Sequence, residues 1–149
     1  MIKLQDLIPE ARISTSDIEL FKMARKVLQK IMIKNGGRPG KRHTTRIRGA
    51  NQFSSSLKGK WTYAWEPFKR GAPGHGYIHV MGDEKLIKKV SRKIEAESKR
   101  AMLDVNFEHG VSSINQSAYW KVKSKFGYDS RQFKKVEKIF DKYRIKKNY

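Results

Sequence analysis

The stretch that decides the fold is "WTYAWEPFKRGAPGHGYIHVMG", which runs from Trp61 to Gly82. Aromatic and β-branched residues are concentrated at its two ends, and such residues favour extended strands. Two prolines and three glycines, residues typical of turns, lie between positions 67 and 76. The pattern predicts an antiparallel hairpin, with strands within residues 56–68 and 76–82 and a long basic loop that includes residues 69–75.

An amphipathic segment precedes this hairpin. Residues 16–34 place apolar side chains on one face at helical spacing, and Ser16 with Glu19 has the spacing of a capping box. Asn35, Gly36 and Gly37 accept positive φ at low cost, so we expect the helix to end there.

Further helices are predicted after the hairpin. Asp83 and Glu84 provide acidic residues at the start of a long helix that reaches about Leu103. Ser130 begins a last helix, in which apolar residues keep helical spacing over exposed lysines.

Residues 118–126, "AYWKVKSKF", have an ambiguous pattern. Apolar and basic residues alternate, which favours a strand with Trp120, Val122 and Phe126 on one side. A helix opened by Ser113 and Gln116 fits nearly as well. The 149 residues therefore predict a single α+β domain over 1–149 that contains an N-terminal helix, a hairpin, a long second helix, a C-terminal strand or helix, and a terminal helix.

The charge of the chain is strongly one-sided. It carries 34 Lys and Arg against 14 Asp and Glu, a formal net charge of +20. Self-repulsion from such an excess costs stability unless a polyanion neutralises it, and nucleic acid is the commonest polyanion. Between Leu20 and Trp65 there are twelve Lys or Arg residues and no acid. We therefore expect a nucleic acid, DNA or RNA, as the partner.

Residues 35–52, "NGGRPGKRHTTRIRGANQ", form an Arg/Gly-rich arm within this region. The arm holds four Arg, one Lys and four Gly. The guanidinium group pairs two phosphate oxygens, and glycine lets the backbone approach a phosphate closely. We expect contacts to nucleic acid from the arm and from basic residues near the hairpin: Arg38, Lys41, Arg42, His43, Arg46, Arg48, Lys58, Lys60, Lys69 and Arg70.

Three aromatic residues, Trp61, Tyr63 and Trp65, occupy alternate positions and share one face of the predicted strand. Their simplest role is to pack in the core beneath the helices. Base stacking by Trp61 and Trp65 is the alternative.

A catalytic role is the less favoured interpretation. Glu66, Asp83 and Lys85 follow the acid and D/E-x-K order of Mg²⁺-dependent nucleases. Asp83 is explained equally well as a helix cap, and Pro67 disrupts the strand that delivers Glu66. Four histidines could bind Zn²⁺ or act as acid and base, but we favour simple surface contacts for them: His43, His75, His79 and His109.

The composition excludes several further classes of site. The chain has no Cys, so disulfides, thiolate metal sites and thiol nucleophiles are absent. No P-loop, dinucleotide-binding glycine pattern or serine nucleophile elbow occurs, and no cofactor is expected. Without a signal peptide or membrane span, the sequence predicts a soluble, intracellular protein. We expect a backbone-binding protein with little sequence specificity. The alternatives are a structural component of a viral particle or ribonucleoprotein, which would contact neighbouring subunits, and, less favoured, a metal-dependent nuclease.

Overall fold

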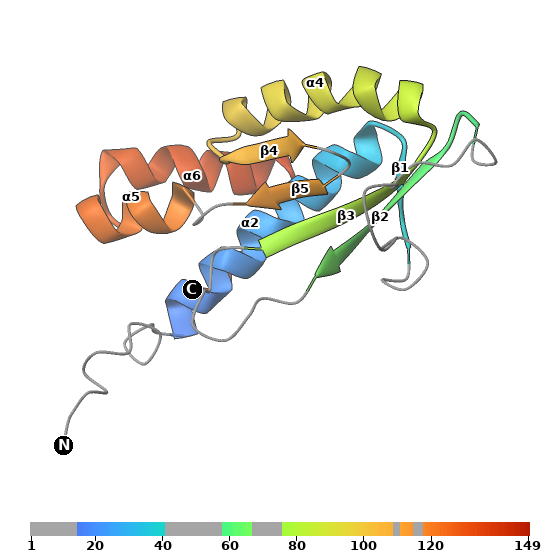
Figure 1. The fold of residues 1–149 in the computed structure, drawn as a ribbon. Helices are drawn as coiled ribbons and strands as arrows, with labels where there is room; N and C mark the ends of the chain where they lie inside the picture. The colour runs from blue at the N-terminus through green and yellow to red at the C-terminus, as the bar shows by residue number, and fades with distance from the viewer. Residues whose placement is uncertain (1–14, 41–57, 67–75, 109–110, 115–117) are drawn as a thin grey trace.

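The N-terminal helix, α2 (Thr15–Lys34), begins one residue before its predicted start. The computed structural model describes residues 15–40, 58–66, 76–108, 111–114 and 118–149 (Figure 1). As predicted, α2 ends directly before Asn35 and Gly36. The Asn35 side-chain amide donates to the carbonyl of Ile31 at 2.8 Å, and Gly36 adopts a φ of 90°.

The predicted hairpin is confirmed. Strands β2 (Trp61–Glu66) and β3 (Gly76–Gly82) pair antiparallel, with Trp61 opposite Gly82 and Glu66 opposite Tyr77. Because side chains alternate along a strand, Trp61 and Tyr63 share one sheet face, and both are buried there.

Three shorter strands complete a sheet that has five strands in the described part of the chain, in the order β1-β2-β3-β5-β4. Strand β1 (Gly37–Pro39) lies parallel to β2, at the start of the arm that the sequence analysis treats as a loop. Strands β4 (Val105–Glu108) and β5 (Val111–Ile114) form a second hairpin that was not predicted. These strands are only three or four residues long, so pairing with the neighbouring strands, more than local propensity, defines them.

The two helices predicted at 83–103 and after Ser130 are present. Helix α4 (Glu84–Arg100) has Asp83 as its N-cap. Helix α6 (Arg131–Lys142) begins at Ser130, whose Oγ accepts from the amide of Phe133 at 3.0 Å.

Residues Ala118–Phe126 form a helix, α5, so the favoured strand interpretation was wrong and the helical alternative was right for these residues. Ser113, expected to open that helix, lies in β5 instead, and Gln116 lies outside the described residues. The decisive contacts come from Tyr119 and Lys123, one helical turn apart. Tyr119 is fully buried and its hydroxyl donates to the carbonyl of Ala101 at 2.7 Å, while Lys123 forms an ion pair with Asp17 at 2.7 Å. Alternation of apolar and basic residues along the segment could not reveal these two partners.

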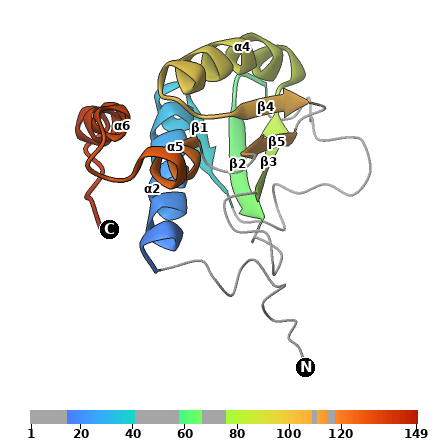
Figure 2. The same ribbon diagram turned by 90° about the vertical axis from the view of Figure 1, so that its left-hand side faces the viewer.

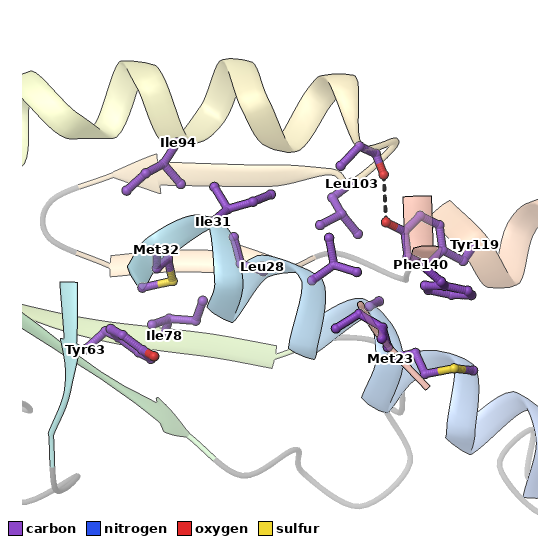
Figure 3. Packing of buried hydrophobic residues seen from close by; sticks show 14 of the residues in the cluster. Met23, Leu28, Ile31, Met32, Tyr63, Ile78, Ile94, Leu103, Tyr119 and Phe140 are labelled. Carbon is purple, nitrogen blue, oxygen red and sulfur yellow. Dashed lines mark hydrogen bonds between the residues drawn. The ribbon is translucent and has the colours of Figure 1, made fainter. Parts of the chain in front are cut away.

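One core joins the sheet and the helices. Figure 2 shows α4 crossing one end of the molecule, with α6 lying beyond α2 from strands β2 and β3. In Figure 3, Leu28 and Ile31 of α2, Ile94 of α4, and Tyr63 and Ile78 of the sheet belong to the same packed cluster. The described elements therefore form one α+β domain, in which α2 and α4 pack on the sheet face that carries Trp61 and Tyr63.

No described helix is long and apolar enough to cross a membrane.

Candidate nucleic-acid interface

Helix α4 carries a continuous basic stripe on its solvent side. Ile87, Val90 and Ile94 turn its opposite side into the core. At 100° per residue, its cations fall within about 140° of the helix circumference and extend over about 22 Å. All seven are exposed: Lys85, Lys88, Lys89, Arg92, Lys93, Lys99 and Arg100.

Helix α6 repeats this arrangement. Its apolar side buries Phe133, Val136 and Phe140 completely. Its cations occupy about 100° of the circumference along about 17 Å. All five are exposed: Arg131, Lys134, Lys135, Lys138 and Lys142.

Few of these twelve cations are neutralised by the protein itself. Within the described part of the chain, one of them forms an ion pair: Lys88, which lies 3.4 Å from Glu84. That pair is exposed on both sides, and exposed pairs contribute little stability. Two other acids near α6 have partners outside the stripe, since Asp141 pairs with Lys147 and Glu137 accepts from Tyr149. The two stripes thus present uncompensated positive charge to solvent.

The two stripes meet at Glu97, which is 8% exposed. One carboxylate oxygen, Oε2, accepts from the hydroxyl of Tyr143 at 2.6 Å and from Lys34 at 3.3 Å. Lys34 is the last residue of α2 and Tyr143 is the C-cap of α6, so the C-termini of three helices converge on this acid. We call this contact the Glu97 junction.

Charges at the ends of both stripes influence the pKa values of the groups at the Glu97 junction. Burial alone would raise the pKa of Glu97, but the hydrogen bonds from Tyr143 and Lys34, with the nearby charge of Lys142, lower it overall. Burial and the contact with Glu97 raise the pKa of Tyr143, while the positive charge of Arg100 opposes that rise. Arg100 ends the α4 stripe and Lys142 ends the α6 stripe. The last cations of both stripes thus lie near the same acid, and we call the two stripes together the basic band.

The other end of the α4 stripe is anchored by Asp83. Its carboxylate accepts from the amide of Gly59 at 3.0 Å and from the amide of Lys85 at 3.0 Å. These two bonds hold the exposed turn Lys58–Lys60 against the start of α4. Lys58 and Lys60, both expected at the interface from the sequence, thus lie next to the first cation of the α4 stripe.

The remaining predicted contact residues are distributed differently. Arg38 is exposed on β1, opposite Thr62, and the alternation of the strand places its side chain on the sheet face away from Trp61. It is therefore separated from the basic band by the sheet. Seven predicted contacts lie outside the described residues: Lys41, Arg42, His43, Arg46, Arg48, Lys69 and Arg70.

The structure does not bring Glu66 close to Asp83 and Lys85, the other two residues of the predicted nuclease site. The register places Asp83 directly after Gly82, which is opposite Trp61, whereas Glu66 ends β2 five residues away. At about 3.3 Å per residue, the two backbone positions are about 16 Å apart, too far for both carboxylates to bind one Mg²⁺. Asp83 instead caps α4, and Lys85 belongs to the basic stripe.

The histidines give no metal site that the structure describes. His79 lies on β3 and is 8% exposed, on the face away from α2. His43, His75 and His109 lie outside the described residues. No group of three potential metal-ligating side chains occurs among the residues that are described.

The two predicted stacking residues both make contacts within the folded protein. Trp61 is 1% exposed, and its indole N–H donates to the carbonyl of Asn35 at 3.2 Å, so its ring cannot reach a base. This corrects the stacking hypothesis for Trp61 and leaves its core role. Trp65 is half-buried, and the guanidinium of Arg25 lies 5.2 Å from the centre of its ring.

Replacing Asp83 tests its structural role. Asp83→Ala removes the acceptor for two amides, and we expect the Tm to fall by about 2 to 4 °C, as for loss of a typical N-cap. Hydrogen bonds from Gly59 and then Lys85 lower the pKa of Asp83 despite an opposing effect of burial. The stabilisation is therefore present above the unfolded-state pKa of about 3.9 and is lost as the pH falls through the lower folded-state pKa.

Thermal unfolding of both proteins between neutral and acidic pH measures this effect. The Tm difference between wild type and Asp83→Ala should shrink below about pH 4. Asp83→Asn keeps an acceptor oxygen, so its Tm should fall less than that of Asp83→Ala. An equal loss in both variants, unchanged at low pH, would contradict the capping role.

Comparison of the chain with protein-family models, with curated proteins and with solved structures finds no match. A functional assignment therefore depends on the charges and geometry of the chain.

The α4 and α6 stripes were missing from the predicted contact residues. The sequence pattern does show basic residues on the outer side of both helices, but a solvated helix face commonly looks the same. The distinguishing feature is the convergence of the helix ends on Glu97, which depends on contacts between residues 63 and 46 positions apart.

Proposed function

We propose that this protein binds nucleic acid through the phosphate backbone, with little sequence specificity. The observation that carries the proposal is the basic band: twelve exposed cations on α4 and α6, one of which is ion-paired within the described residues. Lys and Arg side chains that neutralise phosphates release bound counterions, and this release dominates non-specific binding.

The composition of the band supports backbone contacts over base readout. Nine of the twelve cations are Lys, which acts as a point charge, whereas bidentate contacts to base edges favour the planar fork of Arg. The band also follows the outer faces of two helices that end at one junction. A single recognition helix inserted into a groove would instead leave the second stripe without a role.

The arm at residues 35–52 is proposed as a second contact region. Its single described cation, Arg38, is exposed and forms no ion pair with another described residue. Because Arg38 lies across the sheet from the basic band, the arm would contact a separate part of the nucleic acid. The two regions should therefore contribute independently to the salt dependence of binding.

Salt titration of the full chain tests the proposal. With six to ten phosphate contacts, affinity should fall by about 10³- to 10⁵-fold between 50 and 200 mM salt. An arm variant with four Arg→Ala changes should bind more weakly and have a shallower slope, while its stability stays within about 1 kcal/mol of wild type. The changed residues are Arg38, Arg42, Arg46 and Arg48.

Fluorescence anisotropy with labelled oligonucleotides measures both affinity and slope. Absence of binding at 50 mM salt, or binding that does not respond to salt, would refute the proposal. Sedimentation of the same samples separates a monomeric binding protein from a subunit of a larger assembly, because an assembly subunit should oligomerise at moderate salt.

A further inference from the structure

The basic band lacks exposed aromatic rings. Helix α4 contains no aromatic residue, and the two in α6, Phe133 and Phe140, are fully buried. Tyr143, next to the band, has its hydroxyl bound to Glu97. Proteins that bind single strands without sequence preference combine a basic groove with aromatic side chains on which bases stack. Apart from the half-buried ring of Tyr143, the band therefore has the charge of such a site without its stacking surface.

Aromatic side chains elsewhere in the described structure mostly contact other parts of the protein. Tyr128 and Tyr149 stack on each other, with ring centres 4.8 Å apart. Trp120 lies 6.2 Å from Phe21. Phe126, in α5, is 44% exposed, and no other aromatic residue is exposed among those whose side chains the structure describes. One ring outside the band does not form a platform for successive bases.

The shape of the band favours a stiff, densely charged partner. Each stripe is held straight by its helix, over about 22 Å on α4 and about 17 Å on α6. A nucleic-acid duplex presents one charge per about 1.7 Å of its axis and stays straight over such lengths.

We infer that the basic band binds double-stranded nucleic acid in preference to single strands, through phosphates alone. This inference rests on the proposed function and specifies its substrate class. DNA and RNA duplexes both present rows of phosphates, so the inference covers both. The experiment shows which of the two duplexes binds more tightly.

Competition binding with four oligonucleotides of equal length tests the inference. The probes are a DNA duplex and an RNA duplex of about 24 base pairs and mixed sequence, with oligo(dT) and oligo(U) as single strands. At 100 mM salt, at least one duplex should bind about tenfold or more tightly than both single strands. A higher affinity for one duplex identifies the sugar and supports the inference equally.

A charge variant of the band separates the inference from other sources of duplex binding. Replacing Lys89, Arg92 and Lys93 with Gln should lower duplex affinity by a larger factor than single-strand affinity. Single strands that bind as tightly as both duplexes, or a variant that weakens both classes equally, would overturn the inference while leaving the proposed function intact. Failure of all four probes to bind at 50 mM salt would instead refute the proposed function.

Discussion

Removing four charges from the α4 stripe is expected to weaken nucleic-acid binding by about 10²- to 10³-fold at 100 mM salt, because each lost phosphate contact removes its counterion release. The slope of log K against log salt should become shallower by about 3 to 4. The variant carries Gln at four positions: Lys85, Lys89, Arg92 and Lys93.

The fold should tolerate these substitutions. All four side chains are exposed, and Gln has a helix propensity close to that of Lys and Arg. The stability of the variant should therefore stay within about 0.5 kcal/mol per site of wild type, measured by urea unfolding.

A charge-preserving variant provides the matched control. Exchanging Lys for Arg and Arg for Lys at the same four positions keeps the field and changes the shape of the donors, so binding and slope should stay close to wild type. If the Gln variant binds as tightly as wild type with the same slope, α4 is not part of the interface. If the exchanged variant loses as much as the Gln variant, specific geometry matters more than charge.

Trp61→Ala is expected to lower the free energy of unfolding by about 3 to 5 kcal/mol, the usual loss for a fully buried large aromatic side chain. The ring of Trp61 fills the space over Gly37: a Cβ at that glycine would lie 2.5 Å from the ring. On the neighbouring strand, a Cβ at Gly82 would lie 2.5 Å from the Cβ of Trp61. Removing the indole leaves a cavity next to these strands. Their backbones are already in close contact, so a small shift of the strands cannot fill the cavity.

Urea unfolding followed by circular dichroism measures this loss. Trp65→Ala is the matched control, because Trp65 lies four residues along the same strand and is only half-buried. Trp65→Ala should lower the free energy of unfolding clearly less than Trp61→Ala does. A Trp61→Ala protein that stays as stable as wild type but no longer binds single strands would contradict the core role and restore the stacking hypothesis.

Prediction from sequence succeeded where a local pattern and a local stop signal agree. Helix α2 ends at Lys34, shortly before Gly36, whose positive φ suits glycine, and α6 follows Ser130, whose hydroxyl caps the first turn. The β2–β3 hairpin has aromatic strands and a loop rich in Gly and Pro. Each of these signals operates within a few residues, so the chain around it has little influence on the outcome.

Prediction failed where a distant partner decides between two local solutions. The segment Ala118–Phe126 is compatible with a strand or a helix until Tyr119 meets Ala101 and Lys123 meets Asp17. Strand β1 is too short to form alone and exists because the amide of Gly40 and its neighbours pair with β2, including a bond from Gly40 to Tyr63 at 2.8 Å. The predicted nuclease motif likewise combined Glu66 with Asp83, which lie at opposite ends of the hairpin.

By itself, the sequence determined the excess of positive charge, the amphipathic helices and the central hairpin, because composition and periodicity are properties of neighbouring residues. Only the tertiary structure decided where the charge is concentrated. Lys34, Glu97 and Tyr143 are distant in sequence, and their contact brings the ends of three helices together. The ends of the two basic stripes lie near each other because a buried acid satisfies donors from α2 and α6 at once, and such a junction depends on packing that local sequence does not encode.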